Sequence, residues 1–206
     1  MIDDSAPPPH RVTVRRATAR DIDAACAVLA DAFADSPWTR WTVDADRHGE
    51  RIEALQRLAM ERLALPFGEV WVACEGLVIV GVAMWMPPNV EVPADVLLGV
   101  DPIQEELEGA RHEASRTAEA AAAHLRPAEP HYFLGTVGVR RNRQRRGIGA
   151  ALLQPVLGRA VAEAAWVYLE TSTLENVAFY ERLGFTVTGE QEIPDAGPHV
   201  WAMMRR

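Results

Sequence analysis

The chain is 206 residues long, 49% hydrophobic and 24% charged, with a formal net charge of −8. This size and composition indicate one globular domain with a sizeable core, and no run approaches the ~20 uncharged apolar residues that span a bilayer. The acidic balance argues against a general nucleic-acid binder, so we expect neither nucleic acid nor a membrane as a partner.

The cysteines and histidines favour neither disulfide bonds nor a metal site. Cys26 and Cys74 lie in apolar segments without CxxC spacing, which indicates buried free thiols and a cytoplasmic protein. The six histidines form no HExxH or Cys/His cluster, so we expect no metal site. Residues 1–10 lack the features of a secretory signal and are expected to be a disordered leader before a single domain over 11–206. The absence of lysine and the abundance of Ala, Val and Arg favour a GC-rich bacterial gene.

Apolar periodicity and turn residues predict the elements of the first half of the chain. Thr18 can cap a helix in which Ile22, Cys26 and Leu29 recur at helical spacing. The expected elements are a strand over 12–17, a helix from 19 to about 35, a helix over 47–65, a hairpin of strands over 70–74 and 77–86, and a helix over 103–125.

The second half of the chain predicts a βαβ unit. A strand over 132–139 precedes an arginine-rich loop, a helix that starts near Gly147 and a strand over 166–171. Two strands joined by such a crossover are parallel, with a right-handed connection in nearly all cases. A helix over 176–183 and two further strands, from 185 and over 199–204, complete a mixed α/β sheet.

The loop over 140–149, Arg-Arg-Asn-Arg-Gln-Arg-Arg-Gly-Ile-Gly, brings five arginines directly before a helix. A helix N-terminus offers unsatisfied N–H groups and partial positive charge, and Gly147 and Gly149 let a ligand approach the backbone. Together these features suit a diphosphate. A solvated basic loop is the alternative, and the arginines alone favour it slightly.

Two other phosphate-binding motifs do not fit this loop. A Walker A motif needs a lysine, and the chain has none. A Rossmann fingerprint would use Gly147 and Gly149 with Glu170 about 20 residues on. However, Leu152 occupies the place of its third glycine, and seven residues separate Val139 from Gly147. A Rossmann turn follows its strand almost immediately, so this motif is excluded.

Gln144, Gly147 and Gly149 fill a Q/R-x-x-G-x-G/A motif just after the strand that ends at Val139. This arrangement resembles the acetyl-coenzyme A (acetyl-CoA) motif of the GNAT acetyltransferases. The resemblance implies a GNAT fold, in which a mixed, mostly antiparallel sheet of about seven strands contains a central parallel βαβ unit and is flanked by helices. It also implies acetyl-CoA as co-substrate and N-acetyl transfer as the activity.

In that family the strand before the loop binds the pantetheine arm, and the following helix N-terminus holds the pyrophosphate. The resemblance implies pantetheine contacts from Val137, Gly138 and Val139. The residues that it implies for the phosphates are Gln144, Arg145, Arg146, Gly147, Ile148, Gly149 and Ala150.

The stretch over 176–185 resembles a second GNAT signature, in which a tyrosine protonates the departing thiolate. The resemblance makes Tyr180 the expected general acid, and a phenol of pKa ~10 can donate to a thiolate whose thiol pKa is ~8.5. Packing is the usual role of a tyrosine in such a helix and is the alternative. Asn176 lies one turn earlier on the same face and is expected to orient the cofactor.

The acceptor must lose a proton before it attacks, and Glu170 is our candidate for the base, acting through water. It lies at the C-terminal end of the strand over 166–171, beside the expected cleft. A carboxylate that caps or pairs with an arginine is an alternative of equal weight. Some GNAT enzymes carry a glutamate on the strand before the arginine loop, but residues 132–139 contain none.

The chain also resembles the puromycin N-acetyltransferases within this family, over residues 33–37, 42–48, 133–139 and 169–189. This resemblance implies a puromycin-like aminonucleoside as acceptor and an antibiotic-resistance function. Trp38 and Trp41, in the expected loop after the first helix, and Trp85 could stack on a flat base or aryl group. Core packing is the alternative for all three and is favoured for Trp85.

Other functions remain as alternatives. The acceptor could be a protein N-terminus or another cellular amine, which would require an open groove. A non-catalytic acyl-CoA-binding regulator is a third alternative, but it would not need Tyr180 as an acid. We expect a monomer or a homodimer.

Overall fold

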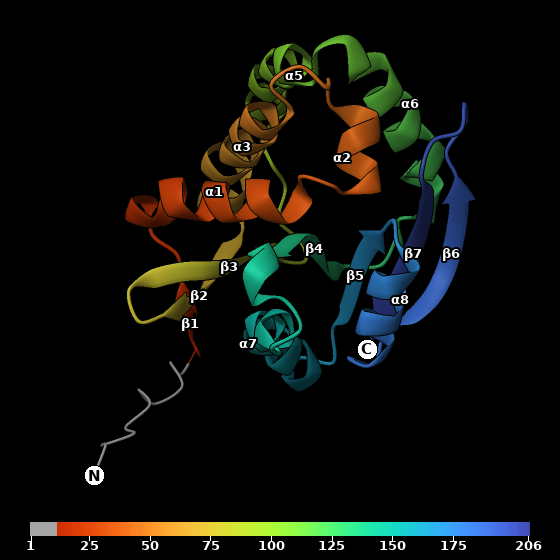
Figure 1. Ribbon diagram of the computed structural model, residues 1–206. Coiled ribbons are helices and arrows are strands. Elements are labelled where there is room, and N and C mark those ends of the chain that lie inside the picture. Colours follow the sequence, from red (N-terminus) through yellow and green to blue (C-terminus); the bar gives the residue numbers. More distant parts are fainter. Residues whose placement is uncertain (1–11) are drawn as a thin grey trace.

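The computed structural model describes residues 12–206, so the expected leader over 1–10 lies outside the described residues. Seven strands form one sheet in the order β1-β2-β3-β4-β5-β7-β6 (Figure 1). Neighbouring strands are antiparallel except β4 and β5, which are parallel. The mixed, mostly antiparallel sheet predicted from the sequence is therefore confirmed. The strands are β1 (Val12–Arg16), β2 (Glu69–Glu75), β3 (Val78–Met86), β4 (His131–Val139), β5 (Trp166–Thr171), β6 (Thr186–Glu192) and β7 (His199–Arg205).

Helices cover both faces of the sheet (Figure 1). The α-helices are α1 (Ile22–Phe33), α2 (Pro37–Thr42), α3 (His48–Ala59), α4 (Leu65–Phe67), α5 (Ala94–Glu108), α6 (His112–Ala122), α7 (Ile148–Ala162) and α8 (Leu174–Glu181). Short helical turns extend them: η1 (Ala19–Asp21), the π-type η2 (Met60–Ala64), η3 (Gly109–Arg111), η4 (Ala123–Leu125) and η5 (Arg141–Arg143). None of the helices in residues 12–206 combines the length and hydrophobicity needed to span a bilayer.

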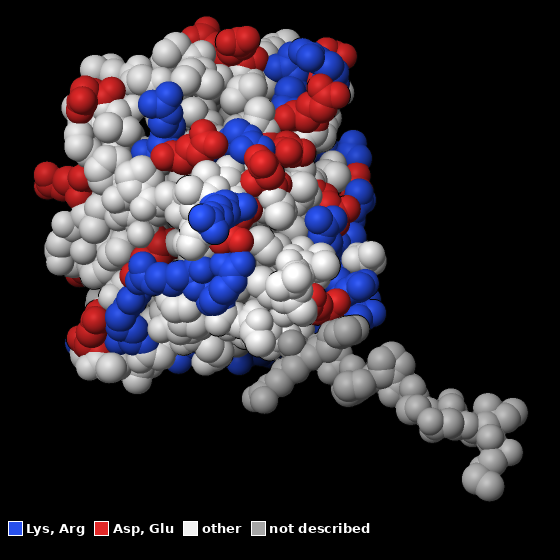
Figure 2. Space-filling model, turned by 90° about the vertical axis from the view of Figure 1, so that its left-hand side faces the viewer, with Lys and Arg blue, Asp and Glu red and all other residues white. Residues whose placement is uncertain are grey.

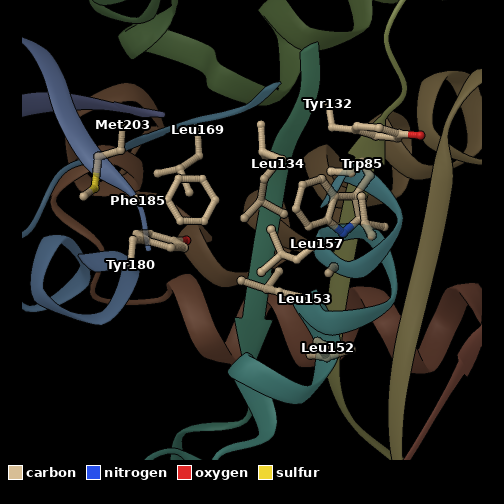
Figure 3. Close-up of a cluster of buried hydrophobic side chains, with 14 of the residues drawn as sticks. Trp85, Tyr132, Leu134, Leu152, Leu153, Leu157, Leu169, Tyr180, Phe185 and Met203 are labelled. Atoms are coloured by element: carbon tan, nitrogen blue, oxygen red, sulfur yellow. The ribbon is translucent and has the colours of Figure 1, made fainter. Parts of the chain in front are cut away.

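The two faces of the sheet have separate cores. On one face, α1 and η2 pack over β2 and β3 through buried residues such as Leu29 and Val82. On the other face, Leu152 and Leu157 of α7 pack with Trp85 of β3 (Figure 3). Burial of each such leucine contributes ~1.5–3 kcal/mol relative to an exposed one. α7 continues through Pro155, so this proline does not end the helix.

Two parts of the helical layer differ from the sequence-based prediction. The expected loop after the first helix folds as α2, because Ser36 takes the extended N-cap conformation and Pro37 the first helical position. The single helix expected over 103–125 is two helices. α5 starts well before Pro102, and Gly109 then takes φ +61°, a conformation that ends the helix before α6 begins.

Candidate active site

The centre of the sheet opens where β4 and β5 separate. Their parallel pairing ends at Leu134 opposite Leu169, while β4 continues to Val139. The next residue, Gly135, has no partner in the register with β3. Such a β-bulge bends a strand. The second half of β4 therefore diverges from β5 and leaves a gap between them.

This half of β4 has an edge that no strand within residues 12–206 occupies. On its other edge, the N–H of Arg140 donates to the carbonyl of Val80 on β3 at 2.9 Å. Backbone groups of an antiparallel strand alternate between its two edges, so those of Val137 and Val139 point away from β3 and into the gap. The side-chain amide of Gln144 accordingly donates to the Val139 carbonyl at 3.1 Å. The backbone groups of Val137 remain available to a peptide-like partner.

Gly138 has a different environment from its two neighbours. It pairs with Val82, so its backbone groups point toward β3. A Cβ at this position would lie 2.9 Å from side-chain atoms of Leu29 and Ala32 in α1. The absence of a side chain therefore lets α1 lie close against the strand that borders the gap.

α7 begins directly after this edge with uncapped backbone N–H groups. Gly147, at the N-cap position, has φ +79° and no side chain to accept from them. A Cβ on Gly147 would project into open space, with no atom of the described residues within 4 Å. Gly149 is turned toward α8, where a Cβ would lie 3.4 Å from the ring of Phe179. The start of α7 thus has the exposed donors and the free volume that an anion requires.

Two of the five loop arginines hold this loop in place. Arg141 reaches the end of α1, where its backbone N–H donates to Asp31 at 2.8 Å and its guanidinium to Asp35 at 2.7 Å. Arg143 pairs with Glu75 of β2 at 2.8 Å. These three carboxylates neutralise part of the basic run and fix its path beside the gap.

The other arginines near the start of α7 are less engaged. Arg145 pairs with Glu175 at 3.2 Å, but both side chains are at least three-quarters exposed, so the pair adds little stability. Arg146 forms no ion pair with any residue in 12–206. On the face shown in Figure 2, arginines lie among Asp and Glu side chains in the upper half, and a band of arginine side chains crosses the lower half. Arg145 and Arg146 directly precede α7 and are therefore the loop cations best placed to offer charge to a ligand at its start.

A cavity of about 300 Å³ occupies the gap between β4 and β5. The residues expected to be functional that line it are Val137, Glu170, Asn176, Tyr180 and Trp38. Lining residues that the sequence analysis did not identify include Phe33, Ser36, Thr39, Gln56, Phe133 and Val200. Those from α1, α2 and α3 reach the cavity through tertiary packing and have no local sequence signal.

Tyr180 enters the cavity from α8 and is 6% exposed. Its ring packs edge-on against Phe179 and Phe185, with centroid distances of 5.0 and 5.7 Å. Within residues 12–206 its hydroxyl forms no hydrogen bond, and Figure 3 shows it directed toward β4. Burial raises the pKa of Tyr180 well above its usual range. The hydroxyl is therefore a neutral proton donor without an acceptor in the described part of the chain.

Glu170 enters the same cavity from the end of β5, with 20% of its side chain exposed. Its Oε1 accepts a hydrogen bond from the hydroxyl of Tyr168 at 2.8 Å. The Nε of Arg126 lies 3.5 Å from the same oxygen. The arginine pairing considered from the sequence is thus present, and the carboxylate nevertheless lines the cavity.

The three tryptophans have different environments. Trp38 lines the cavity from α2. Trp41, on the same helix, does not line it, and the guanidinium of Arg111 covers its ring at 4.3 Å. Trp85 is 1% exposed in the core beneath α7, so the packing alternative applies to it (Figure 3). Only Trp38 is therefore in place to contact a molecule in the cavity.

The comparisons with known proteins agree with this geometry. Residues 30–185 match the model of the Acetyltransferase (GNAT) family. The chain is also similar to a Corynebacterium glutamicum protein whose crystal structure is described as histone acetyltransferase HPA2 and related acetyltransferase. The two share 30% identity over 94% of this chain and 95% of that one, with a TM-score of 0.74.

More distant structures show the same fold. The ribosomal-protein-S18-alanine N-acetyltransferase from Escherichia coli is 15% identical over 95% of this chain and 93% of its own, with a TM-score of 0.57. A Drosophila melanogaster polyamine N-acetyltransferase is 16% identical over 94% of this chain and 99% of its own, also with a TM-score of 0.57. Because the family model matches most of the chain and the Corynebacterium protein shares its fold, this chain belongs to the GNAT family and is an acetyl-CoA-dependent N-acetyltransferase.

Proposed function

We propose that the chain transfers the acetyl group of acetyl-CoA to the amino group of a small molecule, with a puromycin-like aminonucleoside as the favoured acceptor. One observation carries this proposal: the hydroxyl of Tyr180, the carboxylate of Glu170 and the free edge of β4 meet at one cavity. Acetylation of such an amine would inactivate an antibiotic of this class. We place the reaction in a reducing cytoplasm, because Cys26 and Cys74 are buried free thiols.

The residues along β4 and α7 fit the two recognisable parts of coenzyme A. The open backbone groups of Val137 match the amides of a pantetheine arm, which would extend the sheet as an added strand. The N–H groups at the start of α7 and the open space at Gly147 suit a diphosphate, with charge from Arg145 and Arg146. Asn176 lines the cavity beside them. Acetyl-CoA supplies an activated acyl group, and the chain positions it.

Tyr180 serves as the general acid in this proposal. Its hydroxyl stays protonated because burial raises its pKa. A proton from this hydroxyl neutralises the thiolate as the carbon–sulfur bond breaks, and solvent then restores the phenol. General acids of this kind typically contribute ~10²–10⁴-fold in rate.

Glu170 serves as the general base. An amine acceptor is an ammonium ion at neutral pH and cannot attack until it loses a proton. The carboxylate accepts this proton, directly or through one water, and the neutral amine then attacks the acetyl carbonyl. The proton passes from the carboxylate to solvent through the open side of the cavity, and the free carboxylate then accepts the second proton that the nitrogen loses as the amide forms.

The lining of the cavity supports a flat, cationic acceptor. Phe33, Trp38 and Phe133 supply aromatic surface on which a base or aryl ring can stack. Glu170 is the one charged residue that lines the cavity within residues 12–206. An ammonium group is attracted to this carboxylate, whereas an acidic acceptor finds no cation. The volume lies at the lower end of the ~300–1,000 Å³ common for small-molecule sites.

Acetyl-CoA turnover against an amine panel tests the proposal. The panel contains puromycin, other aminonucleosides, aminoglycosides and short peptides. We expect the highest kcat/KM with an aminonucleoside. Turnover of peptides alone would overturn the small-molecule acceptor while leaving acetyl transfer intact, and the best acceptor in another amine class would overturn the puromycin-like assignment.

A peptide amine is the second candidate acceptor. The similar Corynebacterium protein is described as a histone acetyltransferase, and the Escherichia coli protein is described as acting on the alanine of a ribosomal protein. Against it, Trp38 of α2 packs with Ala118 and Ala122 of α6 beside the cavity. We expect this packing to restrict an extended peptide more than a small amine.

A further inference from the structure

Tyr168 and Glu170 are neighbours on one face of β5. Leu169, which lies between them, packs in the core with α7, so the two flanking side chains point to the opposite face. Tyr168 is completely buried there. Its ring stacks on Phe133 at 5.9 Å and meets the ring of His131 edge-on at 5.3 Å. These contacts fix the position of the phenol.

The two oxygens of the Glu170 carboxylate have unequal environments. Oε1 accepts from the Tyr168 hydroxyl at 2.8 Å and is the oxygen closest to Arg126. Oε2 forms no hydrogen bond with any group in residues 12–206. Because the carboxylate lines the cavity, the hydrogen bond from Tyr168 limits its rotation and leaves Oε2 as the oxygen free to bind a substrate.

Tyr168 remains a donor over the working pH range. Burial raises its pKa well above the usual range, and its hydrogen bond to Glu170 raises it further. The other titratable or charged groups that face the pair are Arg126, from η4, and His131, from β4. Arg126 is 59% exposed, so solvent screens its interaction with the carboxylate. The Tyr168 hydroxyl is thus the buried hydrogen-bond partner of Glu170, and it stays protonated over this pH range.

We propose that Tyr168 is a positioning residue for acetyl transfer, which holds Oε1 of Glu170 and thereby presents Oε2 to the acceptor amine. This inference rests on the proposed role of Glu170 as the base. The proton moves from the ammonium nitrogen to Oε2 and then to solvent, while the Tyr168 proton stays on its oxygen. Because the Tyr168 hydroxyl donates to Oε1, the lone pairs of Oε2 stay free for the proton of the ammonium group.

The variant Tyr168→Phe tests the inference because it removes the hydroxyl and keeps the ring. The assay uses acetyl-CoA and the panel amine with the fastest turnover. We expect kcat/KM for the amine to fall about tenfold, as for the loss of a hydrogen bond to a charged group. The loss should be confined to the amine, because only the position of Oε2 changes. The KM for acetyl-CoA should not change.

Tyr132→Phe is the matched control. Tyr132 is also a buried strand tyrosine, and its hydroxyl donates to Glu163 at 2.7 Å, but neither residue lines the cavity. Its variant should lose stability without any fall in kcat/KM for the amine. A Tyr168→Phe enzyme with the wild-type kcat/KM for the amine would overturn the positioning role.

Two further variants separate this inference from the proposed base. Wild-type turnover in Glu170→Gln at every pH would show that Glu170 is not the general base. A large loss in Glu170→Gln together with no change in Tyr168→Phe would overturn only the positioning role. If Tyr168→Phe does not fold, Glu170→Asp breaks the same contact from the cavity side while keeping a carboxylate. It should then lose about tenfold in kcat/KM, and a wild-type value would overturn the inference.

Discussion

Tyr180 and Glu170 reach one cavity from opposite faces of the sheet. Tyr180 belongs to the core that α7 covers, together with Leu169. Glu170 follows Leu169 in β5 and therefore points to the other face. In acyl transfer to an amine, the nucleophile and the leaving group occupy different positions on the tetrahedral carbon. A base and an acid on two sides of the gap can therefore serve the amine and the thiolate separately, within one ternary complex.

Tyr180→Phe should lower kcat and kcat/KM together by ~10²-fold, the low end for a general acid, because the thiolate is already a fair leaving group. The ring contacts with Phe179 and Phe185 remain, so stability and acetyl-CoA affinity should change little. Steady-state kinetics and calorimetric titration with acetyl-CoA provide the measurements. The loss should be smaller for an acyl donor whose thiol has a lower pKa. Unaltered kcat would end the assignment of Tyr180 as the acid.

Glu170→Gln should depress turnover most at low pH, where the acceptor is almost entirely an ammonium ion. The amide keeps the size of the side chain but cannot accept that proton. Initial rates from pH 6 to 9.5 measure the effect, and Glu163→Gln, which changes a carboxylate outside the cavity, is the control. If both variants show the same pH profile, the carboxylate of Glu170 has a structural role only.

Gly147→Ala should weaken acetyl-CoA binding by at least tenfold. Its Cβ would enter the open space before α7 where we place the diphosphate, and φ +79° strains any residue with a side chain by ~1–2 kcal/mol. The rise in Tm that acetyl-CoA causes should be reduced accordingly. Thermal melts with and without acetyl-CoA measure both effects.

Gly158→Ala, in the middle of the same helix, is the control for Gly147→Ala. Nothing lies within 4 Å of a Cβ there, and its backbone is helical. The variant should gain ~0.5–1 kcal/mol in stability and keep its affinity for acetyl-CoA. Equal affinities for acetyl-CoA in the two variants would show that the diphosphate does not bind at the start of α7.

The parts of the fold that could be predicted are those marked by sequence patterns within a few residues. The strand expected over 166–171 coincides with β5, and Gly147 marks the start of α7, because apolar runs and glycines act within a few residues. The start of α5 at Ala94 was missed, since a helix that contains Pro102 runs against local preference. Gln56 lines the cavity only because α3 packs behind α1, which no local pattern encodes.

Trp38→Leu should raise the KM for aromatic acceptors severalfold while leaving kcat and the KM for acetyl-CoA nearly unchanged. The indole lines the cavity and offers a flat surface that leucine lacks. Trp41→Leu is the comparison, since that ring is covered by Arg111 away from the cavity. Kinetics with puromycin and with an aliphatic amine separate stacking from a general loss of fold. Equal KM values for Trp38→Leu and the wild type with puromycin would place the acceptor elsewhere.

The capping network before α1 should make stability depend on pH below about 4. Asp21 is almost buried and accepts hydrogen bonds from both terminal nitrogens of Arg15, at 2.7 and 2.8 Å. It also accepts from the backbone N–H of Thr18 at 2.8 Å. The Arg15 hydrogen bonds, followed by those from Thr18, hold the pKa of Asp21 well below its usual range despite burial. The unfolded chain binds a proton here near pH 3.9, so the contribution is complete above that pH and is lost as pH falls toward the lower pKa of the folded state.

Asp21→Asn should therefore cost ~1.5–3 kcal/mol at pH 7, and the difference from the wild type should shrink as pH falls below 4. Urea unfolding at pH 7, 5 and 3.5 measures this change. Asp23→Asn, on the same helix, is the control, because the Asp23 side chain is 90% exposed and its pair with Arg57 should contribute under 1 kcal/mol. If the two variants lose the same small amount at every pH, the buried carboxylate does not anchor α1. A large loss confined to Asp21→Asn would instead show that the helix which presses on Gly138 of β4 is held at its N-terminus by this one ion pair.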